Sequence, residues 1–531
     1  MQKPNRTLLI YMKKKNVILV FFTVASIFIF PFGLCTGLPL GEGDIPPLTL
    51  LQAVTHTIKS NTAVLLAKQD VRQKKAEVKI EKGDQDLTMA LNLAFDDNKE
   101  PMTPYQQSVY HKDVEKTQTF TTTLSLEKTF ENGIRFGPTI TLKRYHDGTL
   151  ADDPTDNHAT VEFAVDVPLM EVISRIKCHT SGLASKVQLE SELWNMAATV
   201  SGSIRDTAHA FWDALAEKLI LDLYKQAESD AKSLYNDMAL MVRKNEYPAV
   251  NLNRLEANLG AKTINRISQE QALYTARQVL AIRMGASLEN LMALPDIRGK
   301  FPAVMEIVSG IKPLISYATL HRPDLTAYNA GIRYYSRLAE DARRHLLPSL
   351  DLTIGIGSKG LLEEDRNGAY LEAITSNVPG PSYRVGLSFI QKFGNYSAKG
   401  ELIQSRVRLM QTKIERRSLE KTAYSDVLNA FQNYKNSIRT LKKQREVVEK
   451  YRLALEKEWL KFKYQMADLS DLLAMQNDYR DSKINLIHHR KIYAKSVISL
   501  RYACGSLVLI TKKRFSVSQD QLLSPVWDFA Q

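Results

Sequence analysis

The sequence predicts a mainly α-helical protein with a membrane β-strand portion, built as two copies of one plan. Three observations lead to this prediction. Residues 401–504 contain neither glycine nor proline, two groups of short segments alternate apolar and polar residues as strands do, and a helical stretch at 203–247 precedes the later one. The reasons for placing the strands in a membrane follow from the individual segments.

The N-terminus has the pattern of an export signal. Lys13, Lys14 and Lys15 precede a mostly apolar run over 17–32, and Cys35 and Gly37 are small enough for a cleavage site. Residues 1–37 are therefore assigned to a signal peptide. The run is shorter than the roughly 20 apolar residues of a spanning helix, and no comparable run follows, so we expect no helical membrane span. Lipidation of Cys35 is a minor alternative.

Composition and charge argue against several classes of protein. With 44% hydrophobic and 24% charged residues, the chain has the composition of a folded protein. The formal charge of +13 includes five basic residues within the first 15 positions, and later charges interleave, as in Glu456-Lys457-Glu458. Interleaving indicates solvated helix faces and no nucleic-acid partner. Cys178 and Cys504 could pair, but two separate buried thiols are the simpler interpretation.

The first copy begins with N-terminal helices over 38–83 and continues with strands over 84–168. Residues 87–93 alternate, runs with strand character follow at 120–126, 134–142 and 161–167, and the polar segment Asp96 to Lys116 is expected to be a loop. A long helical hairpin is then predicted over 169–285. Its tip is expected near 247–251, because Pro248 ends a helix.

The second copy follows the same order. A linker, or equatorial segment, and a helix are expected over 286–347, strands over 348–393, a long helical hairpin over 394–507 with its tip near 465–469, and a C-terminal tail over 508–531. Within the hairpin, Ile403, Val407, Met410 and Ile414 step by threes and fours. A helix from 400 to about 465 would be close to 100 Å long, which no compact domain accommodates.

Two related endings support a tandem duplication. Leu-Ala-Ile-Arg-Met-Gly-Ala-Ser-Leu at 280–288 and Leu-Arg-Tyr-Ala-Cys-Gly-Ser-Leu at 500–507 both place a glycine where a helix is expected to stop. Extended by a residue or two, the strand-like runs approach the 9 to 11 residues that cross a bilayer. Six strands cannot close a wide barrel in one chain, so closure requires several copies. A soluble β-sandwich gives similar local patterns, but export and the long helices favour the membrane.

No residue pattern indicates catalysis, a cofactor or a metal. His488 and His489 are adjacent on a helix and point in different directions, which suits ligation poorly. Gly355, Gly357 and Gly360 match the bare spacing of a dinucleotide-binding loop, but Asn367-Gly368 leaves no room for the helix such a loop needs. We interpret these glycines as flexibility at a strand end. We expect a protein that is not an enzyme.

Four segments resemble a known family. Leu48-Thr-Leu-Leu-Gln-Ala53 with Asn61, Arg322-Pro-Asp-Leu325, Leu347-Pro-Ser-Leu350, and the stretch Phe462 to Gln476 are similar to motifs of the TolC-like outer-membrane efflux proteins, also called outer membrane factors. The resemblance covers most of the chain. It implies a homotrimer in which each copy lends strands to one shared transmembrane β-barrel and helices to one α-helical periplasmic tunnel. The strand hairpin 119–144 is additional to the two strands that each repeat usually has.

The resemblance also identifies residues of a periplasmic tip that closes the tunnel. Asp471 falls on the tip aspartate, Phe462 on the tip aromatic position, Asp468 on a serine position, Gln465 and Pro248 at or near the tip glycines, and Arg254 on an aspartate position. Three copies of Asp471 would form an acidic ring. Because the residues at the other positions depart from the family's pattern, the resemblance does not define how the gate works.

The implied function is that of a passive channel. The family resemblance places the protein in the outer membrane, in contact with its lipid and extending into the periplasm of a Gram-negative type bacterium. There it would serve a tripartite efflux or type I secretion system, with a periplasmic adaptor protein and an inner-membrane transporter as partners. The alternative from another class is an exported structural coiled-coil protein that tethers envelope layers.

Overall fold

The computed structural model describes residues 47–147, 155–170, 180–244, 250–287, 296–306, 310–363, 372–373, 380–464, 466–511 and 514–525. The predicted signal peptide, Cys178, and the tip residues Pro248 and Gln465 lie outside these ranges. From Pro47 onward the described residues belong to one unit, and the fold described below is that unit's.

The first copy of the repeat runs from helix to sheet and back to helix. Thr49 caps its first helix, since its hydroxyl accepts a hydrogen bond from the Gln52 backbone N–H while the Gln52 side chain returns to the Thr49 N–H. Its elements are α1 (Leu50–Ser60), α2 (Thr62–Gly83), β1 (Thr88–Pro101), the short α3 (Pro104–Tyr110), β2 (Val114–Thr129), β3 (Arg135–Asp147), β4 (Asp156–Pro168), α5 (Thr180–Arg243) and α6 (Val250–Met284).

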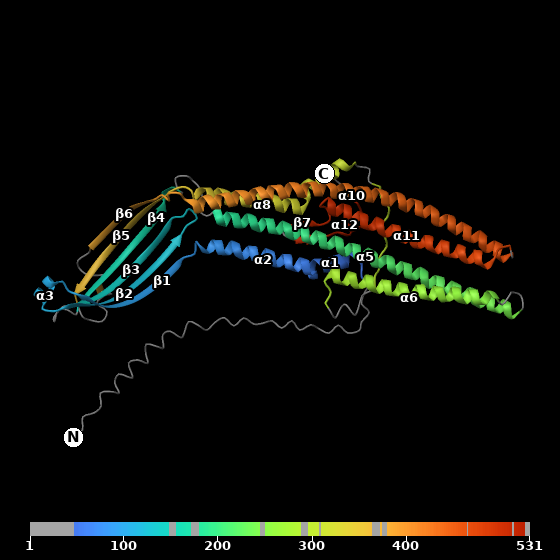
Figure 1. Ribbon diagram of the computed structural model, residues 1–531, viewed down its shortest axis with the longest axis horizontal. Coiled ribbons are helices and arrows are strands. Elements are labelled where there is room, and N and C mark those ends of the chain that lie inside the picture. Colours follow the sequence, from blue (N-terminus) through green and yellow to red (C-terminus); the bar gives the residue numbers. More distant parts are fainter. Residues whose placement is uncertain are drawn as a thin grey trace, which may run out of the picture. The chain divides into compact units, whose positions relative to one another are not determined.

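The second copy has the same plan with two strands. Its elements are α7 (Ile311–His321), α8 (Pro323–Arg344), β5 (Ser349–Glu363), β6 (Gly380–Ile390), α10 (Tyr396–Lys463) and α11 (Leu469–Ala503). The segment after it contains β7 (Leu509–Thr511), β8 (Arg514–Ser516) and α12 (Gln519–Leu523). With 68 residues, α10 is about 100 Å long. Figure 1 shows α5 beside α6 and α10 beside α11.

The duplication extends to backbone contacts. Gly285 follows α6 with φ of 79°, and Gly505 follows α11 with φ of 73°. A Cβ on Gly285 would overlap the carbonyl oxygen of Ser60, at the junction of α1 and α2. A Cβ on Gly505 would lie 2.9 Å from the backbone of Arg322, at the junction of α7 and α8. Each helical hairpin therefore ends in a left-handed glycine pressed against the matching helix junction of its own copy.

The six long strands form one antiparallel sheet in the order β1-β2-β3-β4-β5-β6. The additional hairpin, expected at 119–144, forms the second and third strands of this sheet, β2 and β3, and both strands are longer than the apolar runs suggested. The expected loop over 96–116 is wrong in extent. Ladder pairing continues from Asp96 opposite Thr119 up to Pro101 opposite Val114, because backbone hydrogen bonds prolong the hairpin beyond its apolar part.

The helices pack around α5, which contacts α2, α6, α8 and α11. The main core contains the fully buried Trp212, whose ring meets that of Phe211 edge-on at 5.4 Å between centroids. A second core joins α7, α10 and α11 around Tyr434 and Tyr493. The two hydroxyls hold the segment before α7, since Tyr434 donates to the Met305 carbonyl and Tyr493 donates to that of Ala303 at 2.9 Å.

Among the described residues, no helix combines the length and the hydropathy needed to cross a bilayer.

Candidate functional site

Of the predicted tip residues that the structure describes, Phe462 lies at the end of α10, Asp468 and Asp471 lie at the start of α11, and Arg254 lies near the start of α6. Asp468 is the N-cap residue of α11 and Asp471 lies in its first turn, and both side chains are exposed. Carboxylates at a helix N-terminus are favoured by the unpaired N–H groups there. Stabilisation of the α11 N-terminus is therefore one reason for acidic residues at this position, separate from any role in an acidic ring.

The ends of the two hairpins pack against each other within one chain. Leu234 and Met238 of α5 and Leu255 of α6 form a buried cluster with Leu469 of α11, and the partly buried Phe462 of α10 packs against it. Of the predicted tip residues, Phe462 thus belongs to this contact. Arg254 is exposed on α6, and among the described residues no ion pair joins it to Asp468 or Asp471.

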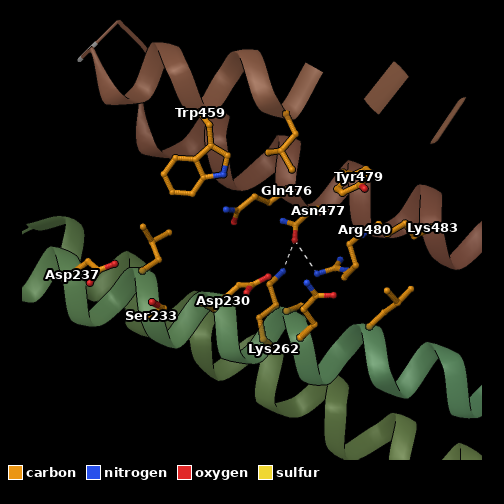
Figure 2. A pocket seen from close by; sticks show the side chains of 16 residues that line it. Asp230, Ser233, Asp237, Lys262, Trp459, Gln476, Asn477, Tyr479, Arg480 and Lys483 are labelled. Carbon is orange, nitrogen blue, oxygen red and sulfur yellow. Dashed lines mark hydrogen bonds between the residues drawn. The ribbon is translucent and has the colours of Figure 1, made fainter. Parts of the chain in front are cut away.

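A cavity of about 410 Å³ lies between the hairpins next to this cluster. Lys262 of α6 crosses it and donates to the side-chain oxygen of Asn477 on α11, which also accepts a hydrogen bond of 3.0 Å from Arg480 (Figure 2). Asp230 and Asp237 of α5 line the same cavity. The cavity therefore holds both acidic and basic groups at the contact between the first and second hairpins.

The Lys262 ammonium is held in an unfavourable setting. Burial and, to a smaller extent, repulsion by Arg480 together lower the pKa of Lys262 to about 8, and Asp481 acts in the opposite direction. Sequence reasoning missed this residue, although a signal existed. Lys262 follows Leu255 and Leu259 at helical spacing, so a lysine occupies a position on an apolar face.

A second polar contact joins the hairpins closer to the main core. Lys495 of α11 forms an ion pair of 2.6 Å with Asp213 of α5, and Lys491 lies 3.5 Å from the same carboxylate. His209 of α5 lies 3.3 Å from the Lys495 carbonyl and 3.2 Å from the Ser499 hydroxyl. Burial lowers the pKa of His209 to about 4, and the charge of Lys495 contributes. The imidazole is therefore neutral at physiological pH.

The six-stranded sheet has one apolar and one polar face. Because directly paired residues point to the same side, the register defines each face. Across the sheet, one row contains Leu91, Leu124, Ile140 and Val161, and the next contains Met89, Leu126, Phe163, Ile356 and Tyr383. The other side of the same strands presents Asn92, Thr123, Thr139, Glu162 and Ser382.

The apolar face is uncovered in the single chain. Leu91 is 58% exposed, Val385 is 77% exposed and Phe163 is 45% exposed. On β4 the apolar residues run from Ala159 to Val167, about 27 Å along the strand, or about 21 Å along a membrane normal at a 40° tilt. This is close to the height of the apolar band of transmembrane barrels.

On the polar face, the glycines of β5 make room for a bridge. Gly355 and Gly357 lie inside the strand and not at its end, so their interpretation as strand-end flexibility is wrong. Glu162 of β4 and Arg384 of β6 form an ion pair of 3.3 Å across β5. A Cβ on Gly355 would lie 2.9 Å from the Glu162 carboxylate and 3.4 Å from the Arg384 Cβ. Small residues in β5 therefore let the two side chains meet.

Both lateral sides of the unit present unpaired groups. The sheet ends at β1 and β6, each with one neighbouring strand. The helices next to the sheet contact one another in the order α2, α5, α8 and α10. In the chain, α2 comes directly before β1 and α10 comes directly after β6. An apolar stripe on α10 is exposed in the single chain and comprises Ile403, Val407, Met410 and Ile414. Strand edges and apolar stripes of this kind require partners.

Solved structures with the same fold are outer-membrane channels. The chain superposes on the CmeC outer membrane channel of Campylobacter jejuni with a TM-score of 0.63 and 14% identity, over 86% of this chain and 85% of that one. For the outer-membrane channel OprN the values are 0.60, 15%, 86% and 90%. For the open state of the Neisseria gonorrhoeae MtrE outer membrane channel they are 0.58, 16%, 86% and 88%. No protein-family model and no curated protein sequence matches the chain.

The predicted fold class is confirmed. The chain has the TolC-like channel fold, in which a helical tunnel continues a β-barrel, and it is internally duplicated. At these identities the likeness concerns the fold alone.

Proposed function

We propose that three copies of this chain form a passive channel through the outer membrane. The structural neighbours are described as outer-membrane channels. One observation carries the proposal. The six-stranded sheet is apolar on one face and polar on the other, and within the described part of the chain neither of its edge strands, β1 and β6, has a second neighbouring strand. Lipid would cover the apolar face, and water would fill the space on the polar face.

Closure between copies is geometrically consistent. Successive strands are antiparallel and their number is even, so β1 and β6 run in opposite directions. Pairing β6 of one copy with β1 of the next therefore continues the antiparallel pattern around a ring. The same rotation would bring the apolar stripe of α10 against the α2 side of the next copy. The number three comes from the family resemblance.

The substrate path would continue from the barrel into the helical hairpins. We propose that α5, α6, α10 and α11 extend into the periplasm and that their tips meet a periplasmic adaptor and an inner-membrane transporter of an efflux or type I secretion system. The transporter would supply the energy, since the sequence has no phosphate-binding loop. Asp471 and Asp468 would lie near the closed end, with Phe462 packed behind them and Arg254 on the neighbouring hairpin. No catalysis is proposed.

The test is purification and reconstitution. We expect the protein in the outer-membrane fraction, extractable only with detergent, as a heat-modifiable trimer that conducts ions across a planar bilayer. A protein that stays in buffer without detergent and never conducts would contradict the proposal. That outcome would favour the tethering coiled coil, which accounts for the hairpins but gives the apolar sheet face no role.

A further inference from the structure

The β2–β3 hairpin lies within the sheet, between β1 and β4, the first and last strands of the first copy of the repeat. It pairs with β1 on one side and with β4 on the other, over ladders that span most of its length. Its connecting turn is short, with Gly133 at φ of 80° and a hydrogen bond of 2.9 Å from the Phe130 N–H to the Ile134 carbonyl. The hairpin is therefore an integral part of the sheet and not an appendage to it.

We infer that this hairpin forms part of the barrel wall, so that the trimer closes a barrel of eighteen strands, six from each copy. The inference rests on the proposed function. Without β2 and β3 each copy would offer four strands, and the barrel would have twelve.

The two faces of the hairpin match those of its neighbours. Leu124 of β2 and Ile140 of β3 lie in one row with Leu91 of β1 and Val161 of β4, on the apolar face. Phe120 and Phe136 add to that face, and each is 41% exposed. A hairpin standing in water outside the membrane would have no need for an apolar face in phase with the strands on both sides.

The opposite face of the hairpin is lined by hydroxyl groups. It contributes Thr119, Thr121, Thr123 and Ser125 from β2 and Thr139 and Thr141 from β3. By contrast, β4 and β6 place Glu162, Asp166 and Arg384 on this face. The additional third of the wall is thus polar and uncharged over its middle, which is suited to contact with water and imposes little selection by charge.

Strand number sets the width of the barrel. Strands about 4.8 Å apart and tilted by about 40° each occupy about 6.3 Å of circumference, so eighteen strands give a backbone diameter of about 36 Å and twelve give about 24 Å. Allowing about 5 Å for side chains on each side leaves about 26 Å, against about 14 Å. An α-helix is 10–12 Å across. The wider barrel would pass a polypeptide as a helical hairpin, whereas the narrower one would pass a single helix.

The insertion can be removed without reversing the remaining strands. β1 and β4 run in opposite directions, and their apolar residues share a phase, since Leu91 and Val161 lie in the same row. A variant lacking residues 114–147 could therefore pair β1 directly with β4 and keep apolar side chains outward.

Cysteine accessibility tests the inference on the full chain. In a background without the native cysteines, single cysteines replace Thr123 and Thr141 on the polar face and Leu124 and Ile140 on the apolar face. Thr353→Cys and Ile354→Cys, on the two faces of β5, are the matched controls. Trimers in lipid vesicles are treated with a water-soluble, membrane-impermeant maleimide, and the rate at which each cysteine reacts is measured.

We expect Thr123→Cys and Thr141→Cys to react as fast as Thr353→Cys, within about threefold, and Leu124→Cys and Ile140→Cys to react at least tenfold more slowly. If β5 alternates but both faces of β2 and β3 react, the hairpin is outside the wall and the inference is wrong, while the channel proposal stands. If β5 does not alternate either, the channel proposal fails as well.

A second measurement uses the width itself. Polymers of graded size are added on the extracellular side of reconstituted channels, and the largest one that enters the barrel is recorded from the change in conductance. We expect the 114–147 deletion to lower that size limit by about twofold in diameter. An unchanged limit in a deletion variant that still forms trimers would overturn the inference.

Discussion

At the residue scale, the tips of the hairpins combine predicted and unpredicted groups. Phe462 could be identified from its motif, and it packs in the contact between hairpins. The hydrogen bond between Lys262 and Asn477 could not be predicted, because it joins α6 and α11 across 215 positions of sequence. Periodicity places a residue on the face of its own helix, but it does not say which other helix that face meets.

His209 gives the structure a pH dependence. Its pKa is about 4 in the folded chain and 6.5 in the unfolded one, so the unfolded state binds more protons between these values. The stability that the folded state has with His209 neutral is present in full above pH 6.5 and is lost as the pH falls toward 4. We expect the free energy of unfolding to drop by about 3 kcal/mol over this window.

Replacement of His209 by Gln, which keeps hydrogen-bonding capacity without the titration, should remove most of that dependence. Chemical denaturation of detergent-solubilised protein at a series of pH values measures it. His111→Gln, at an exposed position after α3, is the control and should change nothing. An equally steep acid loss in His209→Gln would show that other groups cause it.

Asp471 tests the proposed gate. Three carboxylates near one axis repel each other, and bound cations relieve that repulsion. Asp471→Asn should therefore weaken block of the conductance by divalent cations, by about tenfold in the blocking concentration. Asp478→Asn, on the same helix two turns further on, is the matched control. If block is the same in wild type and Asp471→Asn, Asp471 does not form the ring.

At the scale of elements, the long helices were predictable because nothing in 401–504 interrupts a helix, and α10 and α11 fill most of that range. The strands were located by alternation, but their lengths were not. β1 and β2 continue through Asp97 and Lys99 and their partners, where alternation of apolar residues has ended and only backbone pairing remains. The interpretation of the glycines in β5 as strand-end flexibility was also wrong. They lie inside the strand and make room for the ion pair between Glu162 of β4 and Arg384 of β6.

The repeated glycines support a prediction about the elements they end. Gly285→Ala and Gly505→Ala should each destabilise the protein, since the left-handed conformation costs an alanine about 1–2 kcal/mol and the Cβ also meets backbone atoms. Gly260→Ala, in the middle of α6 with open space around it, should instead be neutral or stabilising by about 0.5–1 kcal/mol. Unfolding midpoints measure all three. Equal effects at the three glycines would contradict the proposed role of the hairpin ends.

At the scale of the whole molecule, the sheet and the helices of the unit from Pro47 onward share one feature. Both expose groups that a second copy of the chain could cover. Among the described residues, no further strand pairs with the outer edge of β1 or β6, and α10, which follows β6 in the chain, carries an exposed apolar stripe. Several copies curved around one axis satisfy both needs, and no rearrangement of the chain is required. The sequence alone indicated that closure needs other copies, but it could not indicate that six strands form one continuous sheet.

The most direct test of the account is a disulfide across the proposed seam between copies. In a background without the three native cysteines, Asn92→Cys on β1 is combined in turn with Ser382→Cys, Arg384→Cys, Gly386→Cys and Ser388→Cys on β6, all on the polar face. Leu91→Cys, on the apolar face, replaces Asn92→Cys in the controls. The account predicts that one pair oxidises to a ladder of dimer and trimer with nothing larger, and that the controls stay monomeric on the denaturing gel. A ladder that continues beyond three copies, or cross-linking that does not depend on the face, would contradict it.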